Sequence, residues 1–122
     1  MKRGHLDGAI QAFAELASNK FRYGLLKKIR QWSKFFEAQI GERDDMRGKI
    51  VTQYLKEGED SVSVDHPEYE KCVQDLMDLF NEELEGMPSS IDVDNLPEDM
   101  ELSGHTFASL IELGVLVEND AH

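Results

Sequence analysis

A long amphipathic repeat between Phe21 and Lys56 constrains the fold of this chain more than any other feature. Its first apolar positions recur at intervals of four and three residues: Leu25, Ile29, Trp32, Phe36 and Ile40. This spacing places all of them on one stripe of an α-helix. The stripe pauses at the polar stretch GERDD, residues 41–45, and resumes at Met46. We predict one continuous helix with a solvated middle, in preference to a kink at Gly41.

Shorter apolar periodicities flank this helix. A first short helix is predicted with Asp7 as its cap and with Ile10, Phe13, Ala14 and Ala17 on its apolar side. A third helix is predicted to begin where Asp65 or His66 caps and Pro67 takes the first helical position. Its stripe consists of Tyr69, Val73, Leu76, Phe80 and Leu84, and Gly86 is expected to end it.

The matching rhythm of the second and third stripes favours an antiparallel hairpin over about residues 20–86. In this arrangement the aromatic rings of the long helix would pack against the third helix.

The remaining residues, 87–122, are predicted to form a small acidic appendage. Ile91 and Val93 alternate with aspartates, which indicates a short strand, and SVSV at residues 61–64 is its only apparent partner. Ser103 is predicted to cap a last helix that ends at Gly114. The predicted fold class is mainly α: a long antiparallel helical hairpin with a short N-terminal helix and a small C-terminal strand-plus-helix appendage, in a single domain, 1–122.

Charge divides the chain into two unlike halves. The net charge is -12, yet residues 1–40 carry eight basic and three acidic residues. Residues 57–122 carry nineteen acidic residues and a single base, Lys71.

The segment FRYGLLKKIRQWSKFFEAQI, residues 21–40, combines bases with aromatic rings, which is one pattern of nucleic-acid binding. The rings, however, belong to the apolar stripe and are expected in the core. The bases Lys27, Lys28, Arg30 and Lys34 are expected to face the acidic third helix. Their use by a protein partner is the second reading, and direct nucleic-acid binding ranks last.

The acidic half has two readings. Dense carboxylates can imitate a nucleic-acid backbone and occupy the binding groove of a target protein. Alternatively, they keep a small protein in solution. IDVDNLPEDMEL is a poor match to a calcium loop because Leu96 takes the third ligand position.

The sequence offers no catalytic or cofactor motif. The four histidines are scattered, and phosphate-binding glycine loops and nucleophile elbows are absent. A nucleophile-base pair of Cys72 with His66 is the weaker reading of these two residues, because Cys72 lies next to Val73 on the predicted buried stripe and is expected in the core. We expect no enzyme activity, no cofactor and no metal.

No apolar run is long enough for a membrane span, and Asp7 and Glu15 interrupt any signal-peptide-like stretch. The chain is expected to be soluble and intracellular.

The order of three segments carries a family resemblance. AFAELASNKFRYGLLKKIRQWSKFFEAQ is followed by EYEKCVQDLMDLFNEELEG and then by LPEDMELSGHTFASLIELGVLVEND. This order resembles a family of small uncharacterised tailed-phage and prophage proteins that is defined as a domain of unknown function. The resemblance implies a phage origin and a location in the host cytoplasm or the virion, and it assigns no catalytic or binding residue.

We therefore expect a non-catalytic, phage-encoded protein-interaction module with an assembly or accessory role. It would bind viral or host protein components, and self-association is included among its modes. The alternative is an acidic inhibitor of a host nucleic-acid-binding defence machine, of the anti-CRISPR or DNA-mimic type. The candidate partner-binding residues are Lys27, Lys28, Arg30, Lys34, Glu82, Glu83, Glu85, Asp92, Asp94, Glu98, Asp99 and Glu101.

Overall fold

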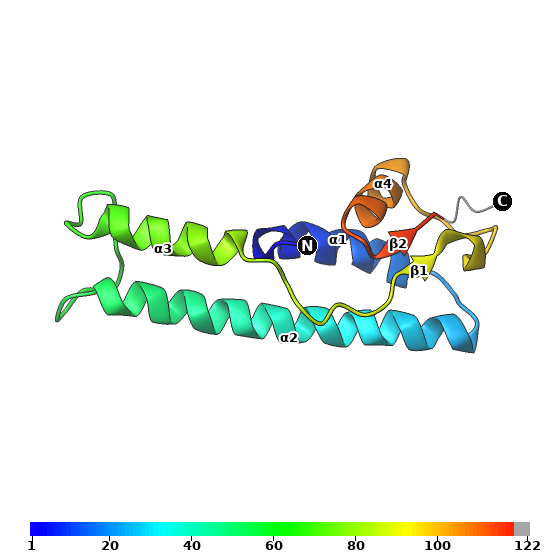
Figure 1. Cartoon of the computed structure of the whole chain (residues 1–122), viewed down its shortest axis with the longest axis horizontal. Coiled ribbons are helices and arrows are strands. Elements are labelled where there is room, and N and C mark those ends of the chain that lie inside the picture. Colours follow the sequence, from blue (N-terminus) through cyan, green and yellow to red (C-terminus); the bar gives the residue numbers. More distant parts are fainter. Residues whose placement is uncertain (119–122) are drawn as a thin grey trace.

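The computed structural model describes residues 1–118, which form an elongated and mainly helical molecule (Figure 1). The helix α2, Tyr23–Tyr54, runs along the long axis of the molecule and is continuous through Gly41, as predicted. The helices α1, Leu6–Ala17, and α3, Tyr69–Asn81, lie one after the other along α2 (Figure 1). The predicted antiparallel hairpin of α2 and α3 is confirmed, but α3 covers only the C-terminal half of α2.

The N-terminal half of α2 packs against α1. A short 3-10 turn, η1 (Arg3–His5), leads directly into α1, so Asp7 lies inside the helix and is not its cap. The buried side of α1 is made by Leu6, Ala9, Ala12, Phe13 and Leu16. Of the predicted apolar side, Phe13 is buried while Ala14 is exposed. The buried residues of α1 therefore recur with the helical period, as predicted, but the buried face is rotated from the predicted one so that it includes Leu6.

An aromatic cluster joins α1 to α2. Trp32 is fully buried, and its ring centre lies 5.6 Å from that of Phe36. Phe36 in turn lies 5.3 Å from Phe13 of α1. The prediction that these rings pack against the stripe of α3 is wrong, because α3 has 13 residues and lies beside the other half of α2.

α3 is shorter than predicted at both ends. It begins at Tyr69 after Glu68, not at Pro67, and ends at Asn81, not at Gly86. Its buried residues are Cys72 and Leu79. The predicted stripe residues Tyr69, Val73, Leu76 and Phe80 are only half-buried.

The connection from α2 to α3 is held by His66. This buried imidazole lies with its Nε2 2.9 Å from Glu59 Oε1, and its Nδ1 accepts a hydrogen bond from the Glu68 amide at 3.0 Å. The hydrogen bond with His66 lowers the pKa of the Glu59 carboxyl. The loop is thus closed on itself by three residues, and it contributes no strand at 61–64.

The C-terminal segment belongs to the main core. The strand β1, Ile91–Asp92, pairs in parallel with β2, Leu116–Val117, so the predicted partner at 61–64 is wrong. A parallel pair needs a crossover, and the chain supplies it with η2, Val93–Asn95, and α4, Gly104–Glu112. The side chains of this segment that enter the core are Ile91, Leu110, Val115 and Leu116.

The predicted cap of α4 is confirmed, since the Ser103 hydroxyl accepts a hydrogen bond from the Thr106 amide. Gly114, with φ of 86°, makes the left-handed turn from α4 into β2.

Candidate protein-binding surfaces

The N-terminal half of α2 has one side without a helix against it (Figure 1). Five residues at intervals of three, one, three and four share this side, which we call the α2 outer face: Tyr23, Leu26, Lys27, Arg30 and Lys34. At 100° per residue they fall within a sector of about 100°, opposite the buried stripe. Tyr23 is 76% exposed and Leu26 45% exposed, so the face mixes apolar and basic side chains.

The bases of this face are not neutralised within the fold. In residues 1–118 no ion pair involves Lys27, Arg30 or Lys34. The Lys27 ammonium instead lies 5.6 Å from the centre of the Tyr23 ring, which is a cation–π distance. Lys28 also forms no ion pair there, and it is half-buried on the flank of the helix.

The expectation that the acidic third helix neutralises these bases is therefore wrong. Gln53 and Tyr54 both donate hydrogen bonds to Asp75, which fixes α3 at the far end of α2. From there α3 runs back along α2 toward Gln39 and Glu42, which share Arg3 with Glu82. Its acidic end therefore lies about one to two helical turns from Lys34, but the Glu82 carboxylate is paired with Arg3 and not with Lys34.

The predicted acidic candidates fall into three groups. Glu82 pairs with Arg3 at 3.4 Å and Glu83 with the amino group of Met1 at 3.2 Å, so both hold the N-terminal turn. The Asp92 carboxylate accepts a hydrogen bond from the Asp94 amide.

Four acidic candidates are exposed and make no ion pair in the described chain: Glu85, Glu98, Asp99 and Glu101. No ion pair joins a candidate base to a candidate acid in residues 1–118, so these residues do not form a single site.

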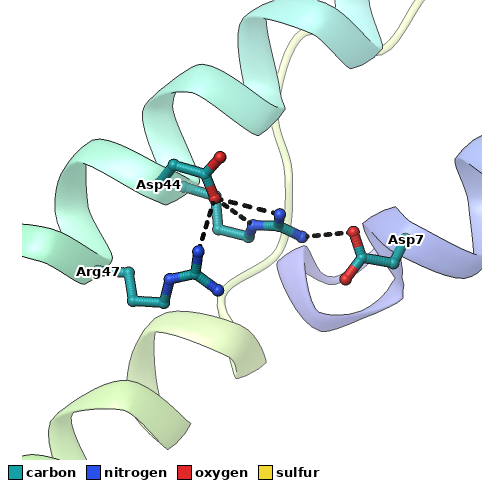
Figure 2. A network of polar contacts seen from close by, with 4 residues as sticks. Asp7, Asp44 and Arg47 are labelled. Atoms are coloured by element: carbon teal, nitrogen blue, oxygen red, sulfur yellow. Dashed lines mark hydrogen bonds and ion pairs between the residues drawn. The ribbon is translucent and has the colours of Figure 1, made fainter.

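Two buried arginines were missed by the sequence reading. Arg43 of α2 lies between Asp7 of α1, at 2.9 Å, and Asp44, at 3.1 Å, and Arg47 reaches the same Asp44 (Figure 2). The hydrogen bond to Asp7 raises the pKa of the Arg43 guanidinium. The sequence signal was the position of Arg43, which continues the stripe of Phe36 and Ile40 at a three-residue step. The middle of α2 is exposed at Gly41, Glu42, Asp44 and Asp45, as predicted, whereas Arg43 is buried and bridges α2 to α1.

Arg3 forms the second junction. Its guanidinium donates to Gln39 and Glu42 of α2, each at 3.2 Å, and to Glu82 just after α3. Its Nε is the buried side-chain polar atom in residues 1–118 that lacks a partner. Arg3 and Arg43 therefore join the three long helices where they meet.

A groove of about 770 Å³ separates α1 from α4. Its lining includes Gly8, His5, Glu15, His105 and Glu112. The Glu15 carboxylate is already occupied, because it accepts hydrogen bonds from the Thr106 hydroxyl and from the Ser103 amide, which lies 2.8 Å away. These bonds lower the pKa of Glu15 and fasten the start of α4 to α1.

Cys72 is buried, and burial raises the pKa of its thiol. A nucleophilic cysteine needs the opposite shift. No group of three potential metal ligands gathers anywhere in residues 1–118. Over the same residues no helix is both long enough and apolar enough to cross a membrane.

Comparison of the chain with protein-family models, with curated proteins and with solved structures finds no match.

Proposed function

We propose that the chain is a non-catalytic, phage-encoded protein-interaction module that binds viral or host protein components. The observation that supports this proposal is the α2 outer face, where exposed bases without ion pairs surround Tyr23 and Leu26. Tyr and Arg are enriched at the energetic centres of protein interfaces. In a chain of net charge -12, such a face suits an acidic patch on a protein better than a nucleic acid, whose uniform charge the other faces would repel.

Charge reversal tests this proposal. The variant K27E/R30E reverses two charges of the α2 outer face. K49E/K56E is the matched control because it makes the same charge change near the C-terminal end of α2, outside that face. Affinity capture from phage-producing cells, followed by mass spectrometry, should recover a viral or host protein with the parent and the control. We expect recovery by K27E/R30E to fall at least tenfold, and equal recovery by all three proteins would contradict the proposal.

A second candidate function is supported by the exposed carboxylates. The exposure of Glu98, Asp99 and Glu101 near the start of α4 favours an acidic inhibitor of a host nucleic-acid-binding defence machine. If this function holds, a purified host defence nuclease should bind the chain in competition with duplex DNA, and the binding should weaken steeply with salt. E98Q/D99N/E101Q should compete less well than the control E57Q/D60N. Binding that is insensitive to salt would exclude mimicry.

A further inference from the structure

A second exposed helix face complements the α2 outer face. On α3 the side chains of Glu70, Gln74, Met77, Asp78 and Asn81 share the side turned away from the core, and we call them the α3 outer face. Met77 is 51% exposed, comparable to Leu26 on α2. Each face therefore has an uncovered apolar side chain among charges, and the signs of the charges are opposite.

The two faces also match in length. Tyr23 to Lys34 and Glu70 to Asn81 both cover eleven helical steps, which correspond to about 16 Å. An antiparallel alignment would set Lys34 opposite Glu70 and Tyr23 opposite Asn81. In the same alignment Leu26 is level with Asp78 and Lys27 with Met77, so Leu26 lies one residue along the axis from Met77 and Lys27 one residue from Asp78. These neighbours and the Lys34–Glu70 pair bring apolar side chains and opposite charges within reach of each other, while Arg30 faces Gln74.

We infer that the α2 outer face of one copy of this chain binds the α3 outer face of a second copy. Contact within one molecule is excluded by position, because α3 is fixed at the far end of α2 by Tyr54 and Asp75. Charge selects this pairing over two α2 faces or two α3 faces, since like charges would then meet. The inference shares with the proposed function only the use of the α2 outer face for binding.

Nearby charges affect the strength of this contact. Lys71 flanks the α3 outer face and would repel the bases of α2, but it is paired with Glu68 at 3.4 Å, so the face remains acidic through Glu70 and Asp78. The net charge of -12 on each copy opposes association. At physiological ionic strength the Debye length is about 8 Å, so this distant repulsion is screened more than the charges in contact. Weak association is expected, in the micromolar to millimolar range of protein concentration.

A charge swap on the purified full-length chain tests the inference. Sedimentation equilibrium should show that K27E/R30E and E70K/D78K each raise the dissociation constant at least tenfold relative to the parent. An equimolar mixture of the two variants should restore association, because the acidic α2 face of one then meets the basic α3 face of the other. K49E/K56E is the charge control, and circular dichroism verifies that each variant is folded.

The neutral variant M77S provides a readout that does not depend on charge. It removes the exposed apolar side chain from the α3 outer face and should weaken association without disturbing the core. Three results would overturn the inference: a parent that stays monomeric at millimolar concentration, association that neither reversal weakens, or a mixture that fails to associate. Sedimentation is measured on the purified chain alone, so a monomeric result overturns the inference without contradicting the proposed function. Binding of an acidic protein by the α2 outer face of such a monomer would support the proposed function, and binding of an oligonucleotide there would count against both.

Discussion

Trp32 joins the aromatic cluster to the C-terminal half of the chain. Its ring is fully buried and lies edge-on to Phe35, with 5.7 Å between the ring centres. Its indole nitrogen donates a 3.0 Å hydrogen bond to the carbonyl of Ser89 in the extended segment after α3. One side chain thus serves both packing and a long-range polar contact.

Replacing Trp32 by Phe should lower the free energy of unfolding by roughly 1–3 kcal/mol. The smaller ring leaves a cavity, and the Ser89 carbonyl loses its donor. Chemical denaturation monitored by circular dichroism would measure the change. Tyr23→Phe, at a 76% exposed position, is the control and should leave stability unchanged. A Trp32→Phe protein as stable as the parent would show that neither contact contributes.

Glu15 makes stability depend on pH. Its pKa is lowered in the folded protein, chiefly by the hydrogen bond from Thr106 and also by the Ser103 amide. A lowered carboxyl pKa adds stability above the ordinary value of 4.5, and this contribution is lost as the pH falls through the lowered value. Glu15→Gln should therefore reduce the melting temperature at neutral pH and reduce it less in acid.

Thermal melts of the parent and Glu15→Gln at about pH 7 and about pH 3.5 would measure this effect. Glu112→Gln changes another carboxylate of the same groove and is the control. A difference between parent and Glu15→Gln that stays constant across the two pH values would contradict the linkage.

At the scale of elements, α2 contains glycines that its conformation does not require. Gly41 is exposed inside the helix, and a Cβ added there would meet nothing within 4 Å. Gly41→Ala should therefore stabilise the protein by about 0.5–1 kcal/mol, because alanine loses less backbone entropy in a helix. Denaturant titration would measure the gain.

Gly48 has the same surroundings and should give a similar gain when changed to Ala. Gly58, with φ of 83°, should show a loss, because a side chain disfavours that conformation. A loss of stability in Gly41→Ala would indicate that the helix is not continuous at this position in solution.

Helical periodicity predicted the elements better than it predicted their ends. The stripe from Leu25 to Ile40 placed α2 correctly because one buried face repeats through it. The start of α3 was predicted from Pro67, yet the helix starts at Tyr69 because His66 accepts a hydrogen bond from Glu68 and closes the preceding turn. A local hydrogen bond of this kind leaves no signal in the apolar periodicity of the sequence.

At the scale of the whole molecule, the three long helices meet at a polar junction. Arg43 bridges α1 and α2 through Asp7, and Arg3 connects the N-terminal turn to α2 and to the end of α3. Because both carboxylate partners of Arg43 are substantially exposed, the bridge is worth less than a fully buried ion pair.

Arg43→Met should lower the free energy of unfolding by about 1–2 kcal/mol, since the methionine keeps most of the apolar contact but loses the charged hydrogen bonds. Urea titration would measure the loss. Arg47→Met, at an exposed position on the same helix, is the control and should cost little. Equal effects of the two changes would show that the bridge to Asp7 is not important for stability.

Which elements pack together could not be predicted from the sequence. The stripes of α1 and α3 are both compatible with α2, and periodicity does not assign either helix to one half of it. The pairing of Ile91 with Leu116 joins residues separated by α4, and a two-residue strand carries no signal that identifies its partner. The unpaired state of Lys27, Arg30 and Lys34 follows from these assignments, so the candidate surface could not be predicted either.

The shared core of α1 and the C-terminal segment has a consequence for biosynthesis. Leu6 and Leu16 pack in the same cluster as Leu110 and Leu116, near opposite ends of the described chain. A growing chain at a ribosome, extended by about 5–20 residues per second, exposes α1 seconds before its partners exist. Until then the apolar sides of α1 and α2 remain exposed to solvent or are covered by a chaperone. Nascent chains should therefore be protease-sensitive until β2 has emerged, and then become resistant in a single step.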